Sequence, residues 1–331
     1  MPLAAIIGHA PIVSLLKQAV RRGSVPQSLL FAGPDGVGKR TVAVALAQAI
    51  NCPKRGASGD DACGKCSTCE RIARGVHSDV VVVDRGEYAS IKIDVVRERV
   101  LDSIGYRPFE AARRVFEIDS AEDLGEQAQD ALLKTLEEPP PSAVLILVTA
   151  FPDLLRPTIQ SRCRRLRFGP LVETDVARVL TERHGLDARQ ARPLAAASGG
   201  SVGRALAAQT GSLDDDREAA FGLVLAARGR VGERLQAAAA LAKHDSDRRD
   251  REALSDRLAI VGSILRDLGA LAAGRADALV NADREADLRA LAGAYDLRRV
   301  IAGYAALNQA QSALSRNAGP KIVADWIAVS L

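Results

Sequence analysis

The sequence has few aromatic residues: Phe, Trp and Tyr together make up 3% of its 331 residues. Nowhere does it contain about 18 apolar residues without a charge, the length that a membrane-spanning helix needs. The stretch from Met1 to Val20 has no basic head followed by an apolar run, so it is unlike a secretory signal. We therefore expect a soluble cytoplasmic protein with no membrane partner.

A strong charge of one sign is also missing. Lys and Arg number 45, Asp and Glu number 41, and the formal net charge is +4. This balance neither requires nor excludes binding to nucleic acid. Ala, Leu and Val are abundant instead, which favours helices and buried parallel strands over a β-sandwich. The length of 331 residues exceeds the usual size of one core and predicts two or three domains.

In the N-terminal half, short β-rich runs alternate with helical patterns. The apolar run Leu29–Ala32 leads into a glycine-rich loop, and an Ala-rich helical pattern follows over 41–50. Further β-rich runs cover 80–83, 114–118 and 144–148, and further helical patterns cover 94–104 and 122–137. This alternation predicts an α/β fold, a parallel sheet with helices on both faces.

The pattern becomes almost entirely helical after the basic stretch Arg162–Arg167. We therefore predict three domains. They are an α/β core over 1–168 with a cysteine insertion at 52–69, a small helical lid over 169–210, and a helical C-terminal domain over 211–331.

The glycine-rich loop, Gly33–Lys39, fits the first seven positions of the phosphate-binding pattern G-x-x-x-x-G-K-[ST]. Gly33, Gly36 and Gly38 let backbone amides wrap phosphate oxygens, and Lys39 reaches the outer phosphates. The strand before the loop and the helix after it make this match specific. The loop is predicted to bind ATP or ADP.

The eighth position of that pattern is Arg40 rather than Ser or Thr. The hydroxyl that normally binds Mg²⁺ is therefore missing, because a guanidinium has no lone pair for a metal. Thr41 offers a hydroxyl one residue late, on another side of the helix.

A second departure follows the β-rich run 114–118. Asp119 ends this run, where an acid holds the water shell of Mg²⁺. The next residue, where an AAA+ ATPase has the Glu that activates water, is Ser120, a poor general base. Glu122 is the one substitute to consider, with a different geometry. Two independent losses predict a loop that binds nucleotide without hydrolysing it.

Four of the five cysteines follow the spacing C-x10-C-x2-C-x2-C. Cys52, Cys63, Cys66 and Cys69 are predicted to hold one tetrahedral Zn²⁺, since four thiolates at this spacing rarely occur without a metal. Four sulfurs leave no open position, so the zinc is structural. The fifth, Cys163, has no nearby His to activate it and is interpreted as buried packing.

Several motifs, in order, resemble those of bacterial DNA polymerase III clamp-loader subunits. They are the glycine-rich loop, the cysteine insertion, the run ALLKTLEEPP at Ala131–Pro140, and Ser161-Arg162-Cys163. The resemblance covers residues 5–208. It implies a RecA-like AAA+ core with a zinc-binding insertion, a small helical lid domain and an all-α C-terminal collar that assembles with other subunits. Arg40 and Ser120 indicate the delta-prime branch, whose ATPase motifs are degenerate.

The resemblance also implies roles for three polar residues. Arg162 is expected to be an arginine finger, supplied in trans to ATP on a neighbouring motor subunit. Thr149 takes the place of a sensor near the terminal phosphate, and Arg204 resembles the sensor arginine of the lid. The implied partners are the gamma/tau and delta subunits, the sliding clamp and primer-template DNA, in a hetero-oligomer with no intrinsic ATPase activity in this chain.

Two alternatives stay open. The first is an active gamma-type motor ATPase, which would have to tolerate Arg40 at the Mg²⁺ position and replace the missing Glu. The second is a DNA-binding regulator with a zinc knob and a relict nucleotide loop. Against the second, the cysteine insertion has few cations nearby and no aromatic residue for base stacking.

Overall fold

The computed structural model describes residues 1–55, 59–86, 88, 90–209, 212–242, 247–276, 279, 281, 284–315 and 318–331. They form two compact units, one of residues 1–179 with 200–202 and one of residues 180–199 with 203–331. The first unit contains the predicted α/β core. The predicted boundary between 210 and 211 lies outside the described residues, and the division into three domains stays a prediction.

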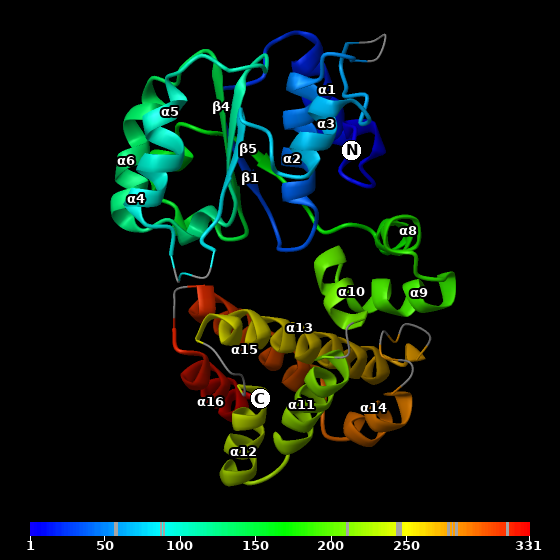
Figure 1. Cartoon of the computed structure of the whole chain (residues 1–331). Helices are drawn as coiled ribbons and strands as arrows, with labels where there is room; N and C mark the ends of the chain where they lie inside the picture. The colour runs from blue at the N-terminus through cyan, green and yellow to red at the C-terminus, as the bar shows by residue number, and fades with distance from the viewer. Residues whose placement is uncertain are drawn as a thin grey trace. The chain divides into compact units, whose positions relative to one another are not determined.

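Five parallel strands form the sheet of the first unit, in the order β2-β3-β4-β1-β5 (Figure 1). Their bounds are Ser28–Ala32 for β1, Val80–Val83 for β2, Arg114–Ile118 for β3, Ala143–Thr149 for β4 and Arg164–Arg167 for β5. The central strands β1 and β4 are buried along their whole length, as expected for a parallel sheet covered on both faces. The predicted fold class is confirmed.

Helices cover both faces of this sheet (Figure 1). On one face lie α1 (Ala10–Arg21), α2 (Lys39–Asn51) and α3 (Ser67–Ala73). On the other lie α4 (Ile93–Val96), a π-helical segment (Arg97–Leu101), α5 (Asp102–Ile104), α6 (Glu126–Glu137) and α7 (Pro157–Gln160). Each layer has its own apolar core, because successive strand residues point to opposite faces.

Two sequence predictions need correction. The helix expected from Glu122 begins only at Glu126, because the chain first bonds back to Ile91: the amide of Gly125 donates to the Ile91 carbonyl at 3.1 Å. Ala121–Asp123 forms a 3-10 turn instead. Strand β5 was not predicted, because within it only Leu166 is buried and the other residues are arginines. Charged residues are usual on a sheet edge and mask the strand pattern.

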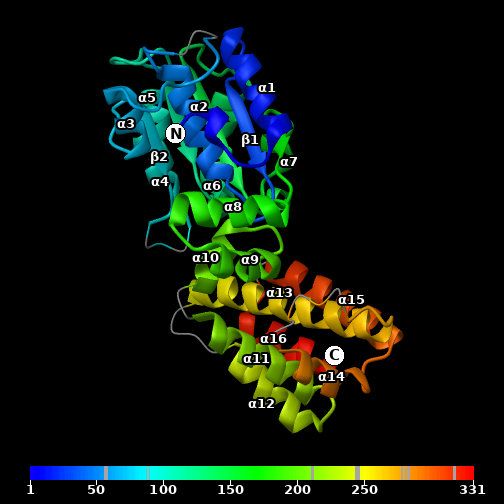
Figure 2. The ribbon, with the colours of Figure 1, turned by 90° about the vertical axis from the view of Figure 1, so that its right-hand side faces the viewer.

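The second unit is helical. It contains the C-terminal end of α8 (Glu173–His184), from Leu180 onward, and all but the first residue of α10 (Val202–Gln209). Its other helices are α9 (Ala188–Ala197), α11 (Ser212–Ala226), α12 (Val231–Leu241), α13 (Asp247–Ala272), α14 (Glu285–Ala292), α15 (Leu297–Ser315) and α16 (Pro320–Ser330). Helices α13 and α15 run side by side (Figure 2). Leu254, Leu258, Val261 and Leu265 form the buried stripe of α13.

In the part of the chain that the structure describes, no helix combines the length and the apolar character needed to cross a lipid bilayer.

The close approach of two strand ends gives a first prediction. A Cβ on Gly33 would lie 2.1 Å from the carbonyl oxygen of Phe168, so Gly33→Ala forces backbone apart. We expect it to lower the free energy of unfolding by about 2–3 kcal/mol. Gly105→Ala is the control, since its Cβ would meet nothing within 4 Å. Urea titration followed by circular dichroism measures both, and equal midpoints for Gly33→Ala and wild type would contradict the packing described.

Candidate functional site

The parallel strands bring three predicted site residues to one edge of the sheet. Gly33 follows β1, Asp119 follows β3 and Thr149 ends β4. Ala32 lies opposite Thr149 in the strand register, and the amide of Gly33 donates to the Thr149 carbonyl at 3.2 Å. The carboxyl ends of parallel strands, next to a helix N-terminus, are where open α/β sheets bind their ligands.

The glycine-rich loop is shaped for an anion. Gly36 and Gly38 have φ angles of 70° and 99°, in the left-handed region that favours glycine. Helix α2 begins directly afterwards, at Lys39. The amides of Gly36, Val37 and Gly38 find no acceptor among the described residues. Three such amides beside a helix N-terminus form a concave site for phosphate oxygens.

Lys39 lies inside this loop with 6% of its surface exposed. Its Nζ donates to the carbonyls of Gly33 and Pro34, each at 2.8 Å. Burial lowers the pKa of Lys39, while the nearby carboxylates of Asp35, Glu122 and Asp119 raise it and oppose that shift. An ammonium group in this position can exchange the two carbonyls for phosphate oxygens.

Arg40 pairs with the acid that was predicted to hold the water shell of Mg²⁺. Its Nη1 lies 3.4 Å from Oδ2 of Asp119. Thr41, which the sequence offered as a late hydroxyl, is exposed on α2. Mg²⁺ requires oxygen ligands in octahedral geometry, and the carboxylate that would bind it is paired with a cation. The residues present do not fit Mg²⁺.

Glu117 is a site residue that the sequence reasoning missed. It lies on β3 two residues before Asp119, so both side chains leave the strand on the same face. It is 2% exposed and its Oε1 has no partner among the described residues. Burial and the Asp119 charge raise the pKa of Glu117 to about 8, and Arg40 opposes the shift. An acidic residue among the apolar residues of the run 115–118 was the signal available.

Glu122, the substitute considered for the missing base, is bonded to residues of and next to β4. It lies in the 3-10 turn after Ser120, and its Oε1 accepts the amide of Ala150 at 3.2 Å. Burial raises the pKa of Glu122, and hydrogen bonds from its own amide, the Thr149 hydroxyl and the Ala150 amide oppose the rise. Thr149, 1% exposed, also accepts the Phe151 amide at 3.0 Å. These bonds hold Glu122 against β4.

Arg162 follows α7 on the surface of the first unit. Its Nη2 lies 2.7 Å from Oε1 of Glu137, at the end of α6, and its Nη1 donates to the Thr158 carbonyl at 3.0 Å. The side chain is 35% exposed. It is thus held in place and still open to solvent on one side.

Arg204 belongs to the second unit, on α10. There its Nε lies 3.6 Å from Oδ1 of Asp256. The structure assigns it a partner within that unit, and its predicted sensor role stays a prediction.

The four predicted zinc ligands converge. The sulfur atoms of Cys52, Cys63, Cys66 and Cys69 all lie within 4.8 Å of one another, and those of Cys52 and Cys66 are 3.9 Å apart. Zinc–sulfur bonds of about 2.3 Å in a tetrahedron place sulfurs about 3.8 Å apart. The donor set therefore fits Zn²⁺ with no position left open.

Hydrogen bonding favours the thiolate at one of these cysteines, and burial opposes it at two others. A backbone hydrogen bond from Lys65 lowers the pKa of Cys63 to about 6, while burial raises the pKa of Cys52 and of Cys69. The amide of Cys63 donates to the Cys52 sulfur at 3.4 Å. Amide donors to sulfur stabilise the thiolates that bind metal.

Comparisons with known proteins agree with these features. A family model described as "DNA polymerase III, delta subunit" matches residues 8–172. The Escherichia coli tau subunit is 31% identical over 258 residues, which are 71% of this chain and 39% of tau. The Pseudomonas aeruginosa delta' subunit is 37% identical over 154 residues, 45% of either chain.

Residues 8–172 belong to the family of DNA polymerase III clamp-loader subunits.

The chain spans less than half the length of the curated relatives that it matches. A solved gamma-subunit-related protein from Thermotoga maritima has a TM-score of 0.42 and 19% identity, and the match covers 95% of this chain and 96% of that one.

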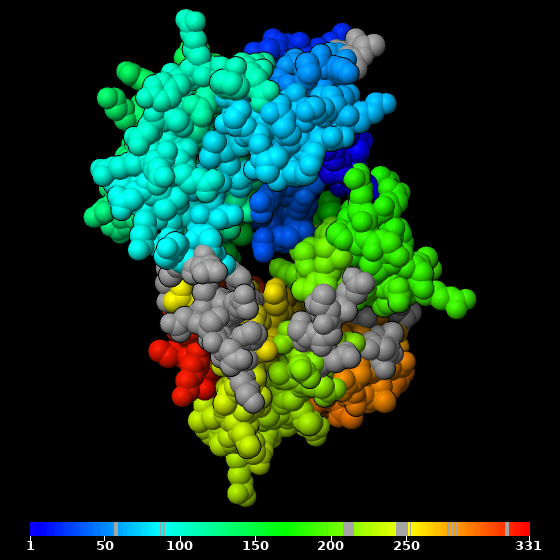
Figure 3. Space-filling model, in the orientation of Figure 1, coloured from blue at the N-terminus to red at the C-terminus, as the bar shows by residue number. Residues whose placement is uncertain are grey.

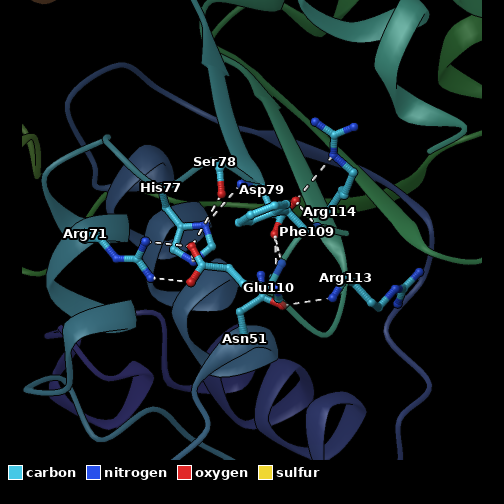
Figure 4. A network of polar contacts seen from close by, with 10 residues as sticks. Asn51, Arg71, His77, Ser78, Asp79, Phe109, Glu110, Arg113 and Arg114 are labelled. Carbon is cyan, nitrogen blue, oxygen red and sulfur yellow. Dashed lines mark hydrogen bonds and ion pairs between the residues drawn. The ribbon is translucent and has the colours of Figure 1, made fainter. Parts of the chain in front are cut away.

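In this clamp-loader core, a polar network ties the cysteine insertion to the sheet (Figure 4). Arg71, on α3, donates to both oxygens of Glu110 at 2.6 and 2.8 Å. Asp79 accepts the amides of Phe109, Glu110 and Ala111. Burial opposes its ionisation, but these amides and the Arg114 charge outweigh burial and lower the pKa of Asp79. No sequence signal pointed to this network.

The remaining cysteine of the clamp-loader core behaves as expected. Cys163 is buried among the apolar side chains between the sheet and α6, and burial raises its pKa to about 12. A neutral thiol in this setting is inert packing.

Zinc binding gives the second prediction. We expect one zinc per chain, lost in Cys69→Ser and kept in Cys163→Ala, as measured by metal analysis.

Loss of zinc should increase hydrogen exchange in 52–73, because the metal holds α3. The pair of Arg71 and Glu110 should extend this increase to 105–111. The fluorescence of Trp326, the single tryptophan, should report an unchanged second unit. Unfolding of the whole chain in one step on chelation would contradict this.

The raised pKa of Glu117 gives the third prediction. Its pKa is about 8 in the folded chain and 4.5 in an unfolded one. Between these values the folded state keeps a proton that the unfolded state has released, so the free energy of unfolding falls as the pH rises. We expect Glu117→Gln to remove about 2–4 kcal/mol of that fall between pH 5 and 8. Denaturant titrations at several pH values test this, with the exposed Glu98→Gln as control; equal pH slopes for wild type and Glu117→Gln would refute it.

Proposed function

We propose that this protein is the delta-prime subunit of a bacterial DNA polymerase III clamp loader, and that it hydrolyses no ATP itself. The observation that carries the proposal is the ion pair between Arg40 and Asp119, at 3.4 Å, in the place of the metal. Ser120 is the second support: it follows Asp119 where a motor subunit has its general base. A loop without metal ligands and base retains only a binding role.

Arg162 is the residue through which the subunit acts on ATP held by a neighbouring motor subunit. It is a permanently charged guanidinium on the surface. Such a group can stabilise the charge that develops on a phosphoryl group transferred in the neighbour. Its partner Glu137 is 52% exposed, so the pair is readily exchanged for a phosphate. In the free subunit Glu137 holds the side chain in one direction.

The second unit supplies a surface for assembly. On α16, Ile322, Trp326 and Val329 are 72%, 41% and 51% exposed, and their spacing places them on one side of the helix. Exposed apolar side chains gathered on one helix mark a protein interface. The all-α unit is accordingly the collar that packs against the gamma/tau and delta subunits in the hetero-oligomer.

The first unit offers a second surface. Tyr106 and Phe109 are 67% and 86% exposed, and the amide of Phe109 is fixed to buried Asp79 at 2.8 Å. The surrounding segment lies at the outer surface of that unit (Figure 3). A loop that is held by hydrogen bonds and presents two aromatic rings is suited to a protein partner. Such a loop loses little conformational entropy when it binds. The sliding clamp, opened around primer-template DNA, is the partner that the proposed function requires.

The remaining assignments follow from this role. Zinc in the cysteine insertion is structural, Thr149 and Arg204 are relict sensors, and the subunit works in the cytoplasm as part of the replisome.

The rival with an observation in its favour is the gamma-type motor ATPase. Relatives named tau or gamma match at 30–35% identity, including the tau subunit of Bacillus subtilis at 35% over 163 residues. A motor subunit would need a metal beside Asp119, and Arg40 stands there. Delta-prime is therefore the better account.

Arg162 gives the fourth prediction. In a clamp loader reconstituted on primed DNA, Arg162→Ala should lower ATP turnover at the one neighbouring site by about 10³-fold, the usual contribution of a trans arginine finger. Assembly, followed by size-exclusion chromatography, should be unchanged.

Arg164→Ala is the matched control, since it removes an exposed arginine two residues away. Equal turnover with Arg162→Ala and wild type would reject the finger role.

A further inference from the structure

Arg40 has a second consequence for the glycine-rich loop. Its side chain is 56% exposed and its Nη1 lies 3.4 Å from Oδ2 of Asp119, whose side chain is 22% exposed. A guanidinium carries five N–H donors in a plane, so it can bond a carboxylate and a phosphate at once. Arg40 thus has donors left over after pairing with Asp119.

We propose that the glycine-rich loop binds the polyphosphate of a nucleotide without a divalent cation, with Arg40 as the built-in counter-charge between Asp119 and the phosphates. This rests on the proposed function in one respect: a loop relieved of hydrolysis has no need of a metal. Three parts of the loop supply the remaining contacts: the amides of residues 36–38, the start of α2, and the Lys39 ammonium.

The acidic side chains around the loop do not prevent this. Glu117 is buried and Glu122 is half-buried, and burial raises the pKa of each, so they repel an anion less than two free carboxylates would. Asp119 is balanced by Arg40 at 3.4 Å. Lys39 adds a further positive charge at the centre of the loop.

A divalent cation is disfavoured by the same residues. Mg²⁺ beside Asp119 would be repelled by the Arg40 guanidinium, and it would lack the hydroxyl that normally completes its shell. Arg40 offers it no lone pair. The eighth position of the loop therefore determines whether bound nucleotide carries a metal.

The test is a titration of the full-length chain with the fluorescent nucleotide mant-ADP, in Mg²⁺ and in EDTA. For wild type we expect the two Kd values to agree within about twofold, as binding without a metal implies. Arg40→Ser removes the guanidinium and restores a hydroxyl. It should bind at least about tenfold more weakly in EDTA than in Mg²⁺, because the metal then supplies the missing charge. Arg289→Ser, which breaks an exposed ion pair on α14, is the matched control and should behave as wild type.

Asp119→Asn is a second variant that does not depend on Arg40→Ser folding well. If Asp119 held a metal, its loss would weaken binding in Mg²⁺. On the present proposal it frees Arg40 for the phosphates, and the Kd in Mg²⁺ should be unchanged or lower. Circular dichroism checks that each variant folds.

Two outcomes would overturn the proposal. One is wild-type binding that disappears in EDTA. The other is no binding of mant-ADP by wild type in either buffer, which would leave the Arg162 role, measured separately in the assembled loader, untouched.

Discussion

The parallel pairing of β1, β3 and β4 is the constraint on which the rest of the site depends. It brings the ends of three strands to one edge, so residues far apart in sequence, Gly33, Asp119 and Thr149, become neighbours. Burial of both faces of the sheet makes this register strongly preferred, because a slip by one residue would turn apolar side chains away from the cores. The sheet therefore holds the shape of the loop whichever side chains follow the strands.

The charged side chains at this edge of the sheet determine whether it suits a metal ion or a phosphate. In a working ATPase the acids at the strand ends hold a metal and a water. Here the guanidinium of Arg40 neutralises Asp119, and Glu122 is bonded to β4. What remains chemically available is a positive, amide-lined loop on the inside and an arginine, Arg162, on the outside. The first suits retention of phosphate and the second suits action on another subunit.

Features that follow from local chemistry were predictable from the sequence. The glycine-rich loop and the four cysteines each occupy a short stretch of chain with a recognisable spacing. The parallel sheet follows from the alternation of β-rich runs and helical patterns. Features that depend on tertiary contacts were not. The bond from Gly125 to Ile91 delays α6, arginines hide β5 on the sheet edge, and Asp79 meets three amides about 30 residues away. The pairing of Arg162 with Glu137 likewise needs the fold, since α6 and α7 must first pack together.

The central claim is that this chain has lost hydrolysis while keeping the loop. The most direct measurement is ATP turnover by the purified chain alone in Mg²⁺, compared with Lys39→Ala, in which the loop lysine is absent. The account predicts that both release phosphate at the same background rate, because neither has a metal position or a base. Turnover by wild type that requires Mg²⁺ and is abolished in Lys39→Ala would contradict it, and would assign the chain to the motor branch of the family.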